Sequence, residues 1–201
     1  MTKSSKEWLR RHITDPYVKA ARKQGYRSRA AFKLLELDKK ESILKPGFTV
    51  VDLGAAPGGW SQVAAEKVKP GGRVIAIDLL EIAPISGVTT LKGDFRQVLA
   101  EKHSIATRAD AVLSDLSPNL SGITNVDQAR WLELAEAAVE LCGKILKPDG
   151  VFVVKAFQGE AFDALLERLK AVFKKVKVAK PPASRGESAE TYLVARALRR
   201  L

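Results

Sequence analysis

The sequence predicts an α/β fold with a parallel sheet, because short apolar runs alternate with helix-length segments along the chain. Four runs have the continuous apolar pattern of strands buried on both faces: residues 50–54 (VVDLG), 74–78 (VIAID), 111–115 (AVLSD) and 151–155 (VFVVK). Helix-length segments lie between them at about 60–69 and 127–146. This alternation is typical of a layered architecture in which helices cover a buried sheet.

Proline and glycine signals support these elements and predict others. Residues 69–72 (KPGG) and 147–150 (KPDG) indicate helix stops that are followed at once by the next strand. Residues 28–40 predict an amphipathic helix opened by a serine cap at Ser28. Beyond the fourth strand, we expect a helix and a closing pair of strands, at 160–173, 176–179 and 191–195.

The length of 201 residues fits one well-buried domain with extensions, and no repeat or linker marks a boundary. We expect a single domain over residues 1–201, with a basic helical extension at 1–45 and a core at 46–201. No run approaches the roughly 18 apolar residues of a membrane span, which favours a cytoplasmic protein without a membrane partner.

The sequence contains few of the histidine and cysteine residues that metal sites and thiol chemistry require. His12 and His103 lie far apart, and Cys142 is the one cysteine, so we expect no metal site and no internal disulfide. The favoured interpretation of Cys142 is a reduced thiol in the core.

The net charge of +11 is concentrated at the two ends of the chain. Residues 1–45 carry 13 basic and 5 acidic side chains, residues 46–169 carry 12 and 16, and residues 170–201 carry 9 and 2. Two basic ends around a mildly acidic centre predict a polyanionic partner, with nucleic acid ahead of an anionic membrane surface. Solvated helix faces remain an equally simple explanation of either end alone.

The strand-ending residues indicate a small-molecule site. In open α/β sheets, ligands bind beyond the carboxyl ends of the strands. The first strand runs into a glycine-rich turn in which Gly54 and Gly58 allow a ligand to approach the main-chain amides. The turn has neither the glycine spacing of dinucleotide enzymes nor the Gly-Lys-Ser/Thr ending of a P-loop, which disfavours a nucleoside triphosphate.

Acidic residues follow three other strands. Asp78 has the position from which a carboxylate accepts hydrogen bonds from both hydroxyls of an adenosine ribose, and Asp94 has one suited to an adenine amino group. Asp115 ends the predicted strand at 111–115. A single aspartate at a strand end more often caps a helix or forms a turn, but several around one glycine turn favour a site.

Lys155 interrupts an apolar strand at the same edge of the sheet. Partial burial disfavours the charged form of a lysine, so Lys155 is a candidate general base. A lysine that snorkels to solvent or pairs with a neighbouring carboxylate explains the pattern equally well.

Seven segments, in order, resemble the FtsJ/RrmJ family. They are YRSRAAFKLLEL at 26–37, DLGAAPGGWSQ at 52–62, VIAIDLL at 74–80, GDFR at 93–96, SDLSPN at 114–119, VVKAFQG at 153–159 and SRGESAETYLVA at 184–195. The resemblance covers residues 15–196 and implies S-adenosylmethionine-dependent methylation of a uridine 2′-hydroxyl in 23S ribosomal RNA of the large subunit. It also implies a Rossmann-like methyltransferase fold, whose seven-stranded, mostly parallel sheet ends in an antiparallel strand, and we expect a monomer.

The resemblance also implies the site residues. A catalytic Lys-Asp-Lys-Glu set falls on Lys33, Asp115, Lys155 and Glu190, with Glu187 as the alternative for the last position. The cofactor-binding positions fall on Gly54, Gly58, Trp60, Asp78, Asp94 and Asp115.

We assign Lys155 as the base that takes the 2′-hydroxyl proton, since burial and the like charge of Lys33 favour its neutral form, whereas Asp115 favours the ammonium form. Asp115 then positions Lys155 and the donor, and Glu190 orients Lys33 or the substrate ribose. The candidate phosphate contacts are Lys19, Arg22, Lys23, Arg27 and Arg29 at one end and Lys174, Lys175, Lys177, Lys180 and Arg185 at the other.

Three alternatives stay open at this point. Ribose methylation of transfer RNA or an mRNA cap uses the same fold and set. A non-catalytic RNA-binding or ribosome-assembly factor, and an oxidoreductase with the same sheet, agree less well with the residues present.

Overall fold

A seven-stranded sheet forms the centre of the protein in the computed structural model, which describes residues 14–101, 108–118, 121–186 and 188–199. Its strands are β1 (Thr49–Leu53), β2 (Arg73–Asp78), β3 (Val88–Lys92), β4 (Ala109–Ser114), β5 (Leu146–Phe157), β6 (Phe173–Ala179) and β7 (Glu190–Leu198). Their order across the sheet is β3-β2-β1-β4-β5-β7-β6. His12, His103 and Glu187 lie outside the described residues.

The direction of the strands confirms the predicted fold class. β1 to β5 pair in parallel, from β3 at one edge to β5. β7 runs antiparallel to both of its neighbours, β5 and β6. Chain reversal at β7 places Glu190 beside Phe157 and Tyr192 beside Lys155. The antiparallel strand therefore adds side chains to the edge at which the parallel strands end.

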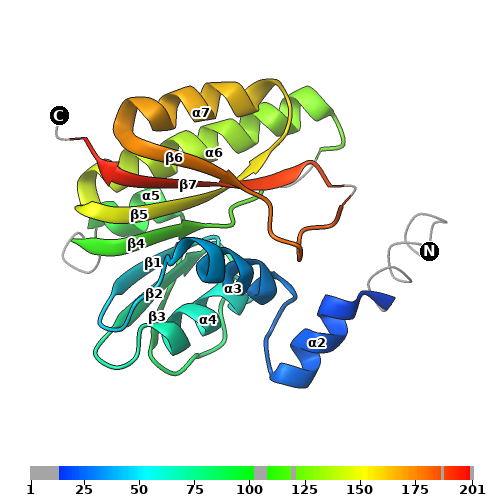
Figure 1. The fold of residues 1–201 in the computed structure, drawn as a ribbon, viewed down its shortest axis with the longest axis vertical. Helices are drawn as coiled ribbons and strands as arrows, with labels where there is room; N and C mark the ends of the chain where they lie inside the picture. Colours follow the sequence, from blue (N-terminus) through cyan, green and yellow to red (C-terminus); the bar gives the residue numbers. More distant parts are fainter. Residues whose placement is uncertain (1–13, 102–107, 119–120, 187, 200–201) are drawn as a thin grey trace.

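Helices cover both faces of the sheet (Figure 1). They are α2 (Pro16–Gln24), α3 (Ala30–Glu41), α4 (Gly59–Lys67), α5 (Phe95–Glu101), α6 (Thr124–Ile145) and α7 (Glu160–Val172). α3 and α4 lie on one face, α5, α6 and α7 lie on the other, and α2 projects away from the sheet beside α3. Among the described residues, no helix combines the length and apolar composition needed to cross a bilayer.

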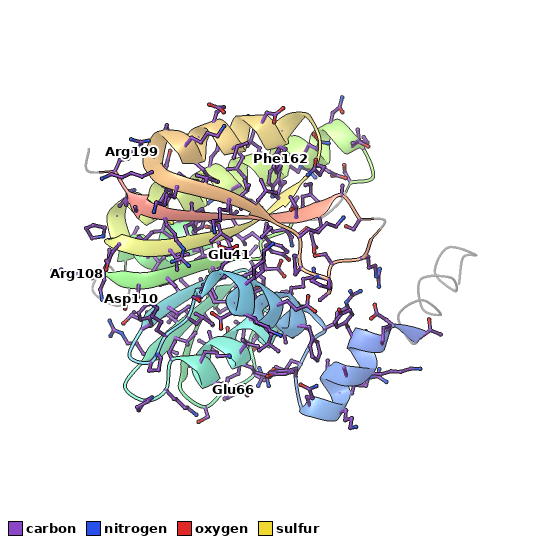
Figure 2. The ribbon with its side chains drawn as sticks, in the orientation of Figure 1. Glu41, Glu66, Arg108, Asp110, Phe162 and Arg199 are labelled. Atoms are coloured by element: carbon purple, nitrogen blue, oxygen red, sulfur yellow. The ribbon has the colours of Figure 1, made fainter. Side chains whose placement is uncertain are left out.

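Each face of the sheet has its own apolar core, and side chains fill the space between the layers (Figure 2). On the α6 and α7 face, buried Trp131, Cys142 and Leu165 pack on the sheet. Leu34 of α3 and Trp60 of α4 pack on the opposite face. Burial on both sides explains why the central strands read as continuous apolar runs. Cys142 is a buried free thiol, as expected.

The starts of two predicted elements are wrong, and the bounds of one helix were not predicted. α3 begins at Ala30 with Arg29 as its N-cap, and no side chain caps it, so the predicted serine cap at Ser28 is wrong. Residues 147–150 lie within β5, where a register shift against β4 takes up the extra residues, so they do not precede the strand. α2 lies in the helical extension expected at 1–45, but its bounds were not predicted, although Asp15 caps its first turn and Pro16 follows.

Candidate active site

A cavity of about 380 Å³ opens at the carboxyl ends of β1, β2, β3 and β4. It is lined by Gly54, Ala56, Ile77, Asp78, Leu79, Leu80, Gly93, Asp94, Phe95, Asp115, Leu116, Ser117, Pro118 and Leu134. Four of the six predicted cofactor-binding residues, Gly54, Asp78, Asp94 and Asp115, are therefore brought together around one space. Its position agrees with the rule that ligands bind beyond the ends of parallel strands.

Asp78 is held in place by main-chain amides. Its Oδ2 accepts a hydrogen bond from the Ala56 amide at 2.9 Å, and its Oδ1 accepts one from the Leu80 amide at 2.8 Å. Each carboxylate oxygen can accept a further hydrogen bond. A fixed carboxylate with free acceptor capacity suits the paired hydroxyls of a ribose.

The Asp94 side chain is bound by two groups of one residue, Arg96. Its carboxylate accepts hydrogen bonds from the Arg96 guanidinium, with Nε at 3.0 Å from Oδ1, and from the Arg96 amide at 2.9 Å. The hydrogen bonds from the Arg96 side chain are the main reason that the pKa of Asp94 is lowered, although burial acts in the opposite direction. The residue thus organises the start of α5 while it lines the cavity.

Gly58 and Trp60 are not among the residues that line this cavity. Gly58 adopts a left-handed conformation at the start of α4, where a Cβ would approach Ile85 to 2.6 Å. Trp60 is buried and donates from Nε1 to the Ala30 carbonyl at 2.8 Å. It lines a smaller cavity of about 150 Å³ that shares Gly54 and Asp115 with the larger one.

Lys155 and Asp115 are in contact beside these cavities. The Nζ of Lys155 donates to the main-chain oxygen of Asp115 at 2.7 Å and lies 3.2 Å from its carboxylate Oδ1. The Lys155 side chain is only 7% exposed. Because Asp115 also lines the larger cavity, it connects Lys155 to the candidate cofactor site.

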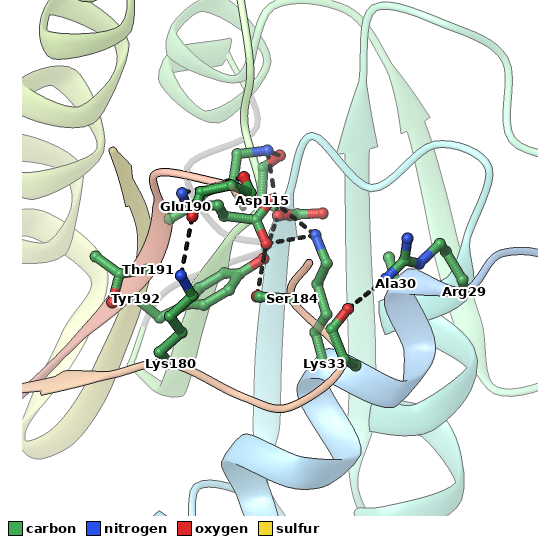
Figure 3. A network of polar contacts seen from close by, with 12 residues as sticks. Arg29, Ala30, Lys33, Asp115, Lys180, Ser184, Glu190, Thr191 and Tyr192 are labelled. Atoms are coloured by element: carbon green, nitrogen blue, oxygen red, sulfur yellow. Dashed lines mark hydrogen bonds and ion pairs between the residues drawn. The ribbon is translucent and has the colours of Figure 1, made fainter. Parts of the chain in front are cut away.

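Lys33 and Glu190 form the second pair of the set. The Nζ of Lys33 lies 2.7 Å from Oε1 and 2.8 Å from Oε2 of Glu190, and Ser184 donates to Oε1 at 2.8 Å. Burial raises the pKa of Glu190, but Lys33, Ser184 and Lys155 outweigh it, so the pKa lies below its ordinary value. All four predicted catalytic residues therefore lie in one polar cluster, brought from α3, the end of β4, β5 and β7. Figure 3 shows Lys33, Asp115 and Glu190 in this cluster, and Lys155 joins it through Asp115.

Tyr192 joins the two pairs, and sequence reasoning missed it. Its hydroxyl donates to Asp115 Oδ1 at 3.0 Å and lies 3.4 Å from Glu190 Oε1, while Lys33 Nζ lies over its ring. Burial raises the pKa of Tyr192 well above its ordinary value, so the hydroxyl stays protonated as a donor. Its place two residues after Glu190, on the same face of a strand, was the available signal.

Asp52 lies fully buried in β1 and was also missed. It accepts a hydrogen bond from Ser61 at 2.6 Å, and its Oδ1 has no partner among the described residues. Burial, with smaller contributions from Asp115 and Asp78, raises the pKa of Asp52 to about 7. A polar residue inside an apolar strand is the sequence signal that predicts such a group.

A protein-family model described as FtsJ-like methyltransferase matches residues 26–198 of the chain. The chain belongs to the FtsJ-like methyltransferase family. It is 53% identical over 197 residues to the ribosomal RNA large subunit methyltransferase E of Nitrosospira multiformis, covering 96% of each chain. It is 52% identical over 202 residues to the protein of the same name from Dechloromonas aromatica, covering 98% of each.

Solved structures agree with this family assignment. A protein from Plasmodium falciparum described as a ribosomal RNA methyltransferase superposes with a TM-score of 0.77 at 31% identity, over 86% of this chain and 98% of that one. Aeropyrum pernix fibrillarin, solved with natively bound S-adenosylmethionine, superposes with a TM-score of 0.61 at 16% identity over 85% of this chain and 75% of that one. The second likeness concerns the fold alone.

The predicted enzyme class is confirmed, because the chain is an FtsJ-like methyltransferase, and S-adenosylmethionine is the methyl donor of that class. The residues of the larger cavity fit this donor. Asp78 would offer acceptors to ribose hydroxyls, Gly54 would let the main chain approach the ligand, and Asp115 would supply negative charge for the sulfonium and ammonium groups.

The predicted phosphate contacts of this FtsJ-like methyltransferase fall into two groups. Arg27 donates to the carbonyl oxygens of Pro57, Ala83 and Pro84, and Arg29 pairs with Asp15. Both guanidinium groups therefore have structural partners.

The other predicted phosphate contacts are exposed. At the amino-terminal end they are Lys19, Arg22 and Lys23 of α2, and at the other end they are Lys174, Lys175, Lys177, Lys180 and Arg185. Of the second group, Lys177 pairs with Glu41, Lys180 donates to main-chain oxygens and Arg185 lies 3.5 Å from Asp15.

Proposed function

We propose that this FtsJ-like methyltransferase transfers a methyl group from S-adenosylmethionine to the 2′-hydroxyl of a uridine in 23S ribosomal RNA of the large subunit. The two curated relatives, matched over nearly their whole length, support a ribosomal RNA substrate. The observation that carries the proposed chemistry is Asp115, which lines the cavity and holds Lys155 at its edge.

Different residues at the cavity bind different parts of S-adenosylmethionine. Asp78 receives the ribose hydroxyls of the donor, Asp94 faces the adenine amino group, and Asp115 lies toward the methionine end. Gly58 and Trp60 hold the glycine turn in place, because Gly58 is the N-cap of α4 and Trp60 donates a hydrogen bond to Ala30 of α3. When bound, S-adenosylmethionine supplies an electrophilic methyl carbon on a sulfonium.

Lys155 acts as the general base on the substrate hydroxyl. In its neutral form, the Nζ lone pair takes the proton of the 2′-hydroxyl while that oxygen forms its bond to the methyl carbon, and the carbon–sulfur bond breaks. Asp115 orients Nζ through the main-chain contact at 2.7 Å and the carboxylate contact at 3.2 Å. Lys33, held by Glu190, contributes positive charge that attracts the RNA backbone.

The exposed basic residues of α2 and of the β6 region are proposed to bind RNA phosphates on either side of this edge. Lys19, Arg22 and Lys23 lie on α2, and Lys174 and Lys175 lie on β6. The ribosomal RNA substrate also leads us to propose a cytoplasmic location, and we propose that the enzyme acts as a monomer.

Methyl transfer from labelled donor to RNA, followed by mapping of the modified nucleotide, tests the function. Large ribosomal subunits that lack the modification, free 23S RNA, transfer RNA and capped mRNA serve as the four substrates. We expect 2′-O-methylation of one uridine in 23S RNA. Methylation of transfer RNA or of a cap alone contradicts the substrate, and donor binding without transfer to any RNA favours an assembly factor.

A further inference from the structure

Two further charged side chains, one at the N-cap of α3 and one within the helix, lie on the same face as Lys33. Arg29 precedes Lys33 by four residues and Glu36 follows it by three, and these spacings align side chains along one helix face. Lys33 reaches Glu190, whereas Arg29 and Glu36 both reach the segment between β6 and β7. One helix face therefore contacts β7 and the connection that leads to it.

Arg29 and Glu36 hold the two main-chain groups of a single residue, Ala183. The Ala183 amide donates to Glu36 Oε2 at 2.6 Å, and the Ala183 carbonyl accepts from Arg29 Nη2. Ala183 is fully buried, so neither of these groups can turn to water without moving the segment. We call this arrangement of Arg29, Glu36 and Ala183 the α3 clamp.

The α3 clamp lies next to Ser184, which donates a hydrogen bond to the catalytic candidate Glu190. Ser184 follows Ala183, is 5% exposed, and donates from Oγ to Glu190 Oε1 at 2.8 Å. The same carboxylate binds Lys33. Displacing Ala183 therefore displaces Ser184 and loosens the position of Glu190 and, through it, of Lys33.

α2 closes the clamp on its outer side. Glu36 Oε1 accepts a hydrogen bond from the Tyr17 hydroxyl at 3.0 Å, and Arg29 forms an ion pair with Asp15. Asp15 also caps α2 through the Tyr17 amide at 2.9 Å. These contacts form a closed ring, so the orientation of Arg29 and Glu36 is set from both sides.

We propose that Arg29 and Glu36 are positioning residues for the methyl-transfer step, which act on Glu190 and Lys33 through Ala183 and Ser184. This inference rests on the proposed function, since it assumes that the Lys33–Glu190 pair serves the reaction. Neither residue lines the cavities at the cofactor site, so their effect falls on the chemical step and leaves donor binding unchanged.

Single-turnover methylation at saturating donor and RNA tests the clamp. We expect Glu36→Ala to lower the rate about 10- to 100-fold, because small displacements of reacting groups are costly, while the dissociation constant of S-adenosylmethionine stays within twofold. Glu66→Ala is the matched control, since Glu66 of α4 accepts from Tyr26 at 3.1 Å in a similar tyrosine–glutamate contact without reaching the β6–β7 segment (Figure 2).

A double-mutant cycle separates positioning from general stability. Glu36→Ala and Ser184→Ala remove successive links to Glu190, so the double variant should be at most about twofold slower than the slower single variant. Glu66→Ala combined with Ser184→Ala should be no slower than Ser184→Ala alone. Fully multiplicative effects of Glu36→Ala and Ser184→Ala overturn the proposed route.

Arg29→Lys is the second variant, which decides the matter if Glu36→Ala does not fold. Lysine keeps the positive charge beside Asp15 but lacks the second donor arm that reaches the Ala183 carbonyl. We expect a rate at least about fivefold below the wild type. Rates within twofold of the wild type for every variant that folds overturn the inference. Lys155→Ala, measured in parallel, distinguishes the two failures: if it retains activity, the proposed active site is wrong, and if it alone is inactive, only the clamp is wrong.

Discussion

The cofactor cavity and the catalytic cluster are neighbours that hold their carboxylates by different means. Asp78 in the cavity is bound by main-chain amides, and one of them, that of Leu80, lies two residues away. Glu190 in the cluster is bound by the side chains of Lys33 and Ser184, and Lys33 is 157 positions away in the sequence. The cavity is built by local chain geometry, whereas the cluster depends on long-range packing of α3 against β7.

This difference predicts that substitutions in the two regions affect different measurable steps, donor binding in one case and the rate of methyl transfer in the other. Damage to the cavity should weaken donor binding and leave the chemical step intact at saturation. Damage to the cluster should slow the chemical step and leave donor affinity intact. Asp115 belongs to both regions, so variants of the other residues give the cleaner comparison.

Loss of the general base is the largest effect that we expect. Lys155→Ala should lower the single-turnover rate by about 10² to 10⁴, because proton transfer in the transition state is lost. The dissociation constant of S-adenosylmethionine, measured by calorimetry, should stay near that of the wild type. A rate close to the wild type at saturating donor and RNA would remove Lys155 from the mechanism.

The buried carboxyl of Asp52 should make the stability of the fold fall as pH rises, which is the opposite of the pH dependence expected from Glu190. The pKa of Asp52 is raised to about 7, so the folded state keeps a proton that the unfolded chain loses above about pH 4. Its contribution therefore becomes less favourable as pH rises from about 4 to 7, by up to about 4 kcal/mol.

Asp52→Asn should remove this decline, so the variant gains stability relative to the wild type between pH 4 and pH 7. Urea unfolding at several pH values measures the difference. A constant difference between the two proteins across this range would show that Asp52 does not titrate there.

Asp78→Ala should weaken S-adenosylmethionine binding about 10- to 100-fold, as expected for lost hydrogen bonds to a charged acceptor. The rate at saturating donor should fall much less, which is the reverse of the pattern for Lys155→Ala. Titration of the donor under single-turnover conditions measures both quantities. Unchanged affinity would mean that Asp78 does not hold the donor.

Lys33→Met should cost about 1–2 kcal/mol of stability at neutral pH, because Glu190 loses its cation while 13% exposed. The lowered pKa of Glu190 means that the pair stabilises the fold above the ordinary pKa of about 4.5 and loses this effect as pH falls through the lowered value. The difference between variant and wild type should thus shrink on acidification. A cost that grows toward low pH would contradict the assigned pairing.

Sequence patterns predicted the features that depend on residues close together in the chain. The apolar runs predicted β1, β2, β4 and β5, and the strand-end rule brought Asp78, Asp94 and Asp115 to one edge. The antiparallel direction of β7 and the role of Glu190 followed only from the family resemblance, because strand direction leaves little trace in a short apolar run.

Long-range partners were beyond the sequence patterns. Tyr192 looks like an ordinary strand residue until the pairing of β5 with β7 sets it beside Lys155. Arg27 and Arg29 look like solvated charges until their carbonyl and carboxylate partners are known. A side chain that satisfies a distant main-chain group carries no periodic signal, so its partner emerges only from the packed fold.

The position of β7 has a consequence for how the protein becomes active during folding. β7 is the seventh strand along the chain, yet it lies between β5 and β6, which precede it. The sheet is complete only when this late segment pairs with both β5 and β6, and contacts between distant segments form slowly. Because β7 also brings Glu190 and Tyr192, a nascent chain acquires its catalytic cluster in the same event that completes its sheet.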